Sequence, residues 1–265
     1  MKHVLSVQDL SCVGKCSLTV ALPVLSAMGL SCSVLPTAVL STHTAFPKPH
    51  VHSLTEDIVP VCDHWKSVGA SFDAISIGYL SDPGQAAAIE YLLDNFSGFS
   101  VLDPAMGDHG KLYSGLSEAH VAAIKNLCTK ADVLLPNVTE ACLLTDTPYR
   151  ENASLEECRE LLGKMAQFGA DTVILTGISP EQGMTGFMGM DKNLGEFTRI
   201  VPRCPKKFHG TGDLFTAVFT GSCVKGKPVD EAATKAAEFV EQVIAANPTE
   251  SPFGIEFEPH LYRLH

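Results

Sequence analysis

A glycine-rich turn beside a carboxylate is the part of this sequence best suited to chemistry. In KKFHGTGDLFTAVF, residues 206–219, Gly210 and Gly212 flank Thr211, and Asp213 opens a long apolar run. Glycines let a backbone approach a ligand closely, and the free N–H groups at a helix N-terminus attract anions. We therefore interpret Gly210, Thr211 and Gly212 as an anion hole at the start of a helix.

Asp213 admits two explanations. A carboxylate in the first turn of a helix is mildly favourable in its own right, because it faces the positive end of the helix dipole. The other explanation is catalytic: in phosphoryl transfer the protein positions groups, neutralises charge and supplies a carboxylate that accepts the proton of the attacking hydroxyl. An anion hole directly beside a carboxylate favours this second explanation, with Asp213 as a general base.

Other polar residues follow the apolar runs that we expect to be strands. Ligands of open α/β sheets bind outside the carboxyl ends of the strands, so these residues are candidates for a site. Because loops are generally polar, any one of them also has a simple structural explanation. The acidic members are harder to explain in this way, since they have no obvious basic partner. The set comprises Asp9, Thr44, Tyr79, Asp103, Asp108, Asn137, Glu140 and Thr176.

The acidic residues of this set suit a hard cation. Mg²⁺ is usually held by one or two carboxylates together with substrate phosphates, which makes Asp103 and Glu140 candidate ligands. Asp103 could instead form a turn before Pro104. Glu140 could be the third residue of a helix that Asn137 caps. The sequence leaves both alternatives open.

Two familiar nucleotide-binding signatures are missing. VGKCS, residues 13–17, contains Gly-Lys but lacks the first glycine of a GxxxxGK[ST] loop. GTGD differs from GxGxxG and comes near the end of the chain instead of after the first strand. Neither a P-loop nor a Rossmann dinucleotide site is therefore expected.

The elements that must position these residues alternate between strand and helix. This alternation predicts one α/β domain over residues 1–265, with a mostly parallel sheet, helices on both faces and an appended hairpin formed by GMTGFMGM and GEFTRIV. Ser154 and Glu157 form a predicted capping box. Strands are expected at 3–7, 32–40, 73–78, 100–104, 132–137 and 171–177, and helices at 17–29, 54–67, 83–96, 115–127, 154–169, 211–226 and 228–247.

Composition excludes several classes of partner. Of 265 residues, 45% are hydrophobic and 18% charged, which is ordinary for a protein with a substantial core. The net charge of -11 argues against nucleic acid and against an anionic membrane surface. The nine cysteines include no CxxC pair, so we expect free thiols and no zinc site. The chain shows no signal peptide and no membrane span, so we expect it in the cytoplasm.

The motifs together resemble a known family. HGTGDLFTAVFTG is similar to the anion-hole and catalytic-base signature of the ribokinase-like kinases. One branch, the pyridoxal (vitamin B6) kinases, is resembled by SVQDLSCVGKCSLTVALPVLSAMG, STHTAF, GYL, LDPAMGDHGKLY and LLPNVTEA, in that order. The resemblance runs from Val4 to about Ala245 and implies a single-domain ribokinase-like α/β/α sandwich.

The resemblance implies ATP-dependent phosphorylation of the 5′-hydroxymethyl group of pyridoxal, pyridoxine or pyridoxamine. It makes Asp213 the base and the 210–212 turn the anion hole. It assigns Asp103 and Glu140 to Mg²⁺, and Asp108, Asn137 and Thr176 to ATP. A monovalent cation such as K⁺ is a further candidate. Relatives suggest a homodimer, with the B6 vitamer and ATP as its small-molecule partners.

For the vitamer, the resemblance implies a ring site formed by Asp9, Thr44 and Tyr79 under a mobile flap at 43–54. Many members of the family have serine where this chain has Asp9, and a carboxylate there suits a protonated pyridine nitrogen or an amine, which favours broad use of B6 vitamers. We expect adenine near the 195–205 strand and the 228–247 helix. The alternatives are a hydroxymethylpyrimidine kinase and a non-catalytic relative that only binds ligand.

Overall fold

The computed structural model describes residues 1–265, and at its centre lies a nine-stranded sheet in the order β11-β10-β9-β8-β5-β4-β1-β2-β3. Its inner strands run parallel to one another. They are β1 (His3–Ser11), β2 (Ser31–Leu40), β4 (Ala74–Ile77), β5 (Phe99–Leu102), β8 (Val133–Leu134) and β9 (Thr172–Ile178). β3 (Val51–Ser53) pairs antiparallel with β2 at one edge, and β10 (Met184–Asp191) and β11 (Gly195–Pro202) extend the other edge.

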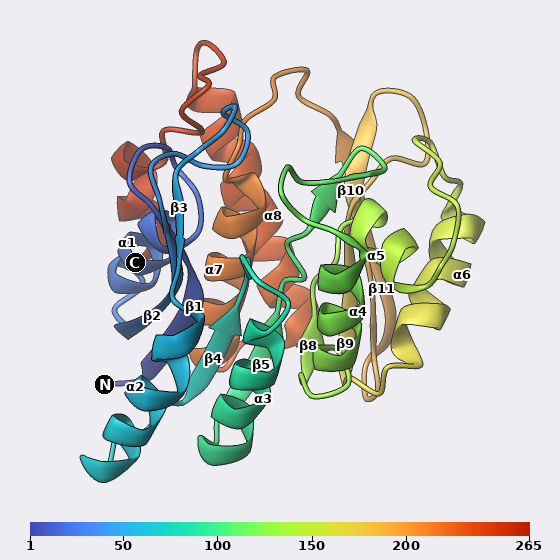
Figure 1. The fold of residues 1–265 in the computed structure, drawn as a ribbon. Helices are drawn as coiled ribbons and strands as arrows, with labels where there is room; N and C mark the ends of the chain where they lie inside the picture. The colour runs from blue at the N-terminus through green and yellow to red at the C-terminus, as the bar shows by residue number, and fades with distance from the viewer.

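Helices cover both faces of this sheet, as Figure 1 shows. On one face lie α2 (Thr55–Ser67), α3 (Gln85–Asn95), α4 (Glu118–Leu127), α5 (Val138–Leu144) and α6 (Leu155–Ala166). The other face carries α1 (Leu18–Ala27), α7 (Thr211–Val224), α8 (Val229–Ala246) and the 3₁₀ helix η1 (Glu258–Leu264). Side chains alternate along each strand, so in β5 Val101 packs toward the second layer and Leu102 toward the first.

The predicted α/β/α architecture is confirmed. The predicted hairpin is also present: β10 pairs with β11, and β10 pairs with β9 and so extends the sheet. The strand expected at 132–137 spans only Val133–Leu134. Pro136 has no N–H for a strand ladder, and Asn137 already caps α5. Both predicted capping boxes, at Ser154–Glu157 and at Asn137–Glu140, are present.

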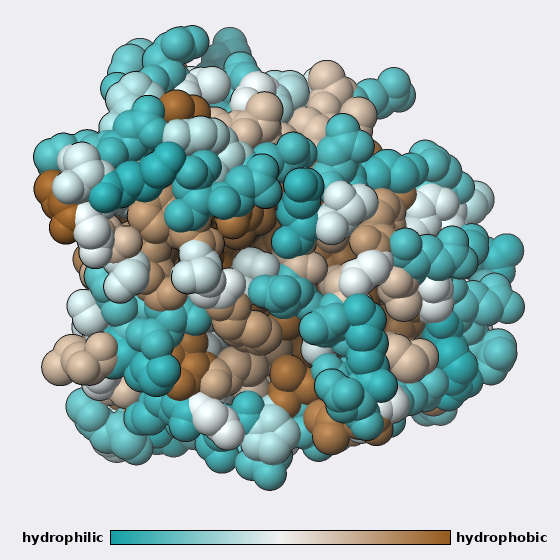
Figure 2. Space-filling model, turned by 90° about the horizontal axis from the view of Figure 1, so that it is seen from below, coloured by the Kyte–Doolittle hydropathy of each residue, from teal (hydrophilic) through white to brown (hydrophobic).

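A small separate hairpin, β6 (Gly107–Asp108) and β7 (Lys111–Leu112), stands beyond the end of β5. It was not expected from the sequence, and neither were the short strand β3 and η1. Figure 2, which views the molecule from below, shows a mostly hydrophilic rim with hydrophobic residues gathered toward its centre. None of the helices combines the length and the apolarity needed to cross a membrane.

Candidate active site

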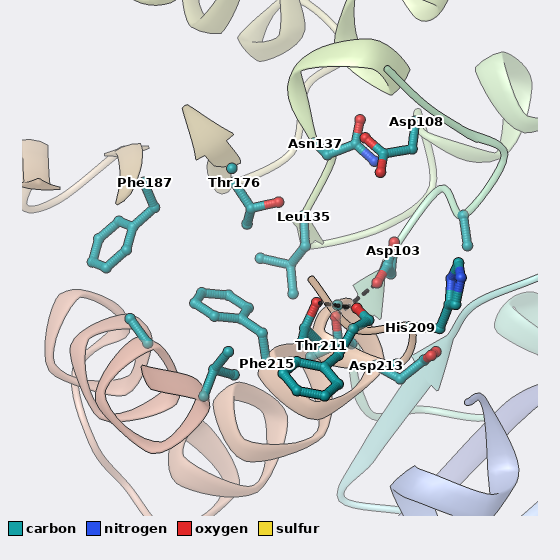
Figure 3. A pocket seen from close by; sticks show the side chains of 18 of the residues that line it. Asp103, Asp108, Leu135, Asn137, Thr176, Phe187, His209, Thr211, Asp213 and Phe215 are labelled. Carbon is teal, nitrogen blue, oxygen red and sulfur yellow. Dashed lines mark hydrogen bonds between the residues drawn. The ribbon is translucent and has the colours of Figure 1, made fainter. Parts of the chain in front are cut away.

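A pocket of about 410 Å³ opens at the carboxyl ends of β5, β8 and β9, against the N-terminus of α7. Figure 3 shows that Asp103 and Asp108 lie toward one end of it and the rings of Phe187 and Phe215 toward the other. The structure brings nine of the predicted residues to its wall: Asp103, Asp108, Asn137, Glu140, Thr176, Gly210, Thr211, Gly212 and Asp213. These come from segments far apart in the sequence, and the parallel sheet is what aligns them.

The turn that precedes α7 has the backbone geometry of a helix cap. Gly210 is the N-cap residue with φ of 85°, a left-handed conformation that favours glycine. The helix starts at Thr211, and Asp213 lies in its first turn. The loop before α1 packs on this turn: a Cβ on Gly210 would lie 2.0 Å from the Lys15 carbonyl oxygen. The first N–H groups of α7 are therefore held at the pocket wall, where an anion can reach them.

Asp213 has an electrostatic environment typical of a functional carboxylate. Burial raises its pKa to about 7, and the negative charges of Asp103 and Asp9 raise it as well. The backbone N–H of Ser17, which starts the neighbouring α1 region, acts in the opposite direction and stabilises the ionised form. A carboxylate with a pKa near neutrality can accept a proton without losing the driving force for the transfer.

Asp103 lies at the end of β5 and is tied to the helix that carries Asp213. The hydroxyl of Thr216, one turn further along α7, donates a 2.8 Å hydrogen bond to Asp103 Oδ2. Burial raises the pKa of Asp103 to about 6, and the bond from Thr216 partly offsets this rise. Thr216 was not predicted, because its spacing from Asp213 is meaningful only once both lie on one helix.

Glu140 is the third residue of α5 and completes its capping box with Asn137, as their spacing suggested. Its Oε2 accepts a 2.8 Å hydrogen bond from Asn137 N, and Oε1 accepts one of 3.1 Å from Met106 N. In return, Asn137 Oδ1 accepts from Glu140 N at 3.0 Å. Burial and then the charge of Asp103 raise the pKa of Glu140. Glu140 therefore has a structural role whether or not it also serves a metal.

Asn137 also supports the β6–β7 hairpin that presents Asp108. Its Nδ2 donates a 2.9 Å hydrogen bond to the Gly107 carbonyl, and Gly110 N donates one of 2.9 Å to Thr139 Oγ1. The Asp108 side chain remains 58% exposed, so it is available to a ligand at the pocket mouth. Thr176, at the end of β9, forms a backbone bridge with Asn137.

The pocket is strongly acidic. Five of its lining residues are Asp or Glu, and none is Lys or Arg. No three His, Cys, Asp or Glu side chains lie close enough together to hold a metal ion by themselves. A phosphorylated ligand must therefore be neutralised by backbone N–H groups and by a cation that the phosphates help to bind.

The opposite end of the pocket is apolar and was largely missed from the sequence. Figure 3 shows Phe187 and Phe215 there, with Leu135 between them and the carboxylates. The other apolar residues of the pocket wall include Phe208, Ala237, Val240 and Ile244. The 228–247 helix contributes, as expected for a nucleobase site, but the 195–205 strand does not. Phe187 of β10 lies there instead, because β10 and not β11 is the strand next to β9. The alternation in GMTGFMGM could have indicated that Phe187 faces inward.

The three predicted ring-binding residues do not line this pocket, but Asp9 lies close enough to Asp213 for its charge to act there. Asp9, buried in β1, accepts hydrogen bonds from Ser17 Oγ at 2.5 Å and from Ser11 Oγ at 2.9 Å. Burial raises its pKa, and its charge in turn acts on Asp213. Burial, together with the charge of Asp9, raises the pKa of Tyr79 to about 12. Asp9 thus acts on both Tyr79 and Asp213.

Thr44 is half-buried in the loop between β2 and β3, and it follows His43, whose ring contacts that of another histidine. The ring of His43 lies 4.9 Å from that of His209, the residue before Gly210. His43 also lies 4.8 Å from Phe46, and its Nε2 is 2.9 Å from the Pro252 carbonyl. This contact brings the 43–54 segment against the turn that precedes α7.

Comparison with known proteins identifies the family. The family model for phosphomethylpyrimidine kinase matches residues 22–255. The chain is 33% identical to the pyridoxine/pyridoxal/pyridoxamine kinase of Bordetella pertussis over 257 residues, 88% of this chain and 85% of that one. A Bacteroides thetaiotaomicron protein, provisionally a phosphomethylpyrimidine kinase and crystallised with pyridoxal, superposes with a TM-score of 0.93 at 35% identity, covering 99% of this chain and 95% of that one.

A second solved structure, the pyridoxal kinase of Lactobacillus plantarum, superposes with a TM-score of 0.89 at 31% identity, covering 100% of this chain and 96% of that one. The resemblance drawn from the sequence motifs is therefore confirmed. The chain belongs to the phosphomethylpyrimidine kinase family, in the ribokinase-like superfamily that includes these pyridoxal kinases, and it is a kinase.

Proposed function

We propose that this protein transfers the γ-phosphoryl group of ATP to the 5′-hydroxymethyl group of a B6 vitamer, giving the 5′-phosphate and ADP. The observation that carries the proposal is the position of Asp213. It stands in the first turn of α7 at the wall of the pocket, and the charge of the buried Asp9 acts on it. A base at this point separates a donor site from an acceptor site.

The pocket suits ATP along its whole length. Its apolar end, with Phe187 and Phe215, offers flat surfaces to a nucleobase. Asn137, Thr176 and Asp108 offer polar groups along the path from there to α7. In this arrangement the γ-phosphoryl group meets the N–H groups of the 210–212 turn, which stabilise the charge that develops during transfer.

The donor set also fits Mg²⁺. Asp103 and Glu140 would hold it together with phosphate oxygens, in agreement with the absence of Lys and Arg from the pocket wall. When bound, Mg²⁺ would neutralise phosphate charge and help to orient the transferred group. Glu140 keeps its capping hydrogen bonds to Asn137 N and Met106 N in this role.

The acceptor is held on the other side of Asp213. The Asp213 carboxylate takes the proton of the hydroxymethyl group while the hydroxymethyl oxygen attacks the γ-phosphorus of ATP and ADP leaves. Asp9, Thr44 and Tyr79 hold the ring, with the negative charge of Asp9 favouring a protonated pyridine nitrogen or an amine substituent. The curated relative from Bordetella pertussis is named for all three vitamers, which supports broad acceptor use.

The test is release of ADP from Mg²⁺-ATP with pyridoxal, pyridoxine, pyridoxamine and hydroxymethylpyrimidine assayed side by side. The proposal expects turnover with the vitamers above turnover with the pyrimidine. The family model is described as phosphomethylpyrimidine kinase, so faster turnover of the pyrimidine would replace the proposed acceptor. Tight vitamer binding without ADP release would instead indicate a non-catalytic relative. The homodimer remains a prediction.

A further inference from the structure

Gln85 is a polar side chain with no exposed surface, and it lies outside the pocket, in the first turn of α3. Its amide is fully used. Nε2 donates to the Thr37 carbonyl at 2.6 Å and lies 3.2 Å from Ser53 Oγ, while Oε1 accepts a 2.8 Å hydrogen bond from Ser81 N. One side chain thus joins three segments of the chain to α3.

These three segments all belong to the proposed acceptor side of the molecule. Thr37 lies on β2, and its hydroxyl donates a 2.9 Å hydrogen bond to the Tyr79 carbonyl. Ser81 follows Tyr79 by two residues. Ser53 is the last residue of β3, at the end of the 43–54 segment, and the next N–H, that of Leu54, also donates to the Thr37 carbonyl at 2.9 Å.

We propose that Gln85 is a positioning residue that fixes the shape of the acceptor site. It holds the Tyr79 loop against β2 and joins both to the end of the 43–54 segment. The acceptor's identity as a B6 vitamer rests on the function proposed above. The clamp, by which we mean the three hydrogen bonds of the Gln85 amide, does not rest on it. None of the three hydrogen bonds reaches the nucleotide pocket, so the effect falls on one substrate.

The energetic argument rests on Ser81 N, whose hydrogen-bond acceptor in the structure is Gln85 Oε1. A buried hydrogen-bonding group left without a partner costs about 1–3 kcal/mol, and satisfied buried networks select a single arrangement. Removing the amide leaves Ser81 N without its acceptor, and a new acceptor requires the loop to move. The Thr37 carbonyl keeps the hydrogen bond from Leu54 N but is no longer joined to α3. A displacement of about 1 Å in a substrate-positioning element can cost up to 100-fold in rate.

The experiment compares Gln85→Met, which keeps the volume and removes all three hydrogen bonds, with Thr172→Val. Thr172 is equally buried and loses one buried hydrogen bond, to Asp191, at the opposite end of the sheet. With whichever acceptor gives turnover, we expect Gln85→Met to raise the acceptor KM about tenfold and leave the KM for ATP unchanged. Thr172→Val should change neither KM.

Two further variants keep the test decisive if Gln85→Met folds poorly. Gln85→Glu retains an acceptor for Ser81 N, so its KM for the acceptor substrate should lie between that of Gln85→Met and that of the unmodified protein. Thr37→Val removes only the hydroxyl that holds the Tyr79 carbonyl, and should raise the acceptor KM alone. An equal rise in both KM values, or no rise in the acceptor KM, would overturn the positioning role.

Amide hydrogen exchange gives a readout that needs no substrate. The N–H groups of Ser81 and Leu54 should exchange faster in Gln85→Met than in the unmodified protein or in Thr172→Val. Ser81 N loses its acceptor, Gln85 Oε1. Leu54 N donates to the Thr37 carbonyl, which Gln85 no longer holds in place. Unchanged protection at both amides would contradict the clamp. If these amides exchange faster and the ADP-release assay shows that hydroxymethylpyrimidine is the preferred acceptor, the positioning role of Gln85 is supported and the vitamer assignment is rejected.

Discussion

The backbone carbonyl oxygen of Lys15 lies 2.0 Å from the point where a Cβ on Gly210 would be. Any side chain at position 210 must therefore displace the loop before α1, and with it Ser17, whose N–H acts on Asp213. We expect Gly210→Ala to lower kcat by at least about 100-fold, the effect typical of a damaged anion hole. Steady-state ADP release measures it.

Gly226→Ala provides a matched control for this prediction. Gly226 also has a left-handed φ, of 90°, but a Cβ there meets nothing within 4 Å. The two variants share the conformational cost of about 1 kcal/mol and differ in the clash with Lys15. If Gly226→Ala lost as much kcat as Gly210→Ala, the loss would reflect general destabilisation and the anion-hole assignment would fail.

The pH dependence of catalysis should report Asp213. Burial raises its pKa to about 7, and the group must be ionised to act as a base. We expect kcat/KM for pyridoxine to fall below about pH 7 and to level off above it, since this parameter reports the free protein. A profile that stays flat down to pH 5 would contradict the assignment.

Asp213 should also weaken the fold at neutral pH. Its pKa in the folded protein lies above that of a free carboxyl, so ionisation penalises the folded state. The penalty is absent below about pH 4, grows between pH 4 and 7, and is complete above pH 7. We expect Asp213→Asn to raise the free energy of unfolding by about 1–3 kcal/mol at pH 8, and by less than half as much at pH 5.

Urea unfolding at the two pH values measures this difference, and Asp108→Asn is its control. The Asp108 side chain is 58% exposed, so its replacement should leave stability nearly unchanged at both pH values. Equal stability of Asp213→Asn and the unmodified protein at pH 8 would show that Asp213 pays no burial penalty.

The apolar end of the pocket should govern nucleotide affinity. Phe215 lies 6.2 Å from Phe187, between ring centres, and both line the pocket. We expect Phe215→Ala to raise the KM for ATP about tenfold and leave the acceptor KM unchanged, because base stacking on an aromatic ring is worth about 1–3 kcal/mol. Phe197→Ala is the control: its ring contacts Phe187 from outside the pocket. A similar rise in this control would show that packing, not base contact, is responsible.

Much of the fold could be predicted from local patterns. The strand and helix periods identified the inner parallel strands and most helices, because each element buries one face or both. The short elements were missed or given wrong bounds. β3, with three residues, was not expected, and β8 has two residues where a strand at 132–137 was predicted. Elements this short show no period and are fixed by pairing with neighbouring strands. The hairpin was recognised, but its pairing with β9 is a tertiary contact that no local pattern carries.

The polar part of the site could be predicted because strand ends and glycine turns have sequence signatures. The apolar part could not, since Phe187 and Phe215 look like ordinary core residues until the sheet order is known. The same holds for Gln85, whose three partners at positions 37, 53 and 81 are close only in the fold. Asp9 is a third case. Its carboxylate marked it as a candidate site residue, but its hydrogen bonds from Ser11 and Ser17 were not predicted.

The most direct test of the account is a competition experiment. The protein is given Mg²⁺-ATP and an equimolar mixture of pyridoxal, pyridoxine, pyridoxamine and hydroxymethylpyrimidine, and the phosphorylated products are identified by mass. Asp213→Asn, run in parallel, should form product at least about 100-fold more slowly. We predict that vitamer 5′-phosphates predominate in the unmodified protein. Predominance of the pyrimidine phosphate, or full activity of Asp213→Asn, would contradict the account.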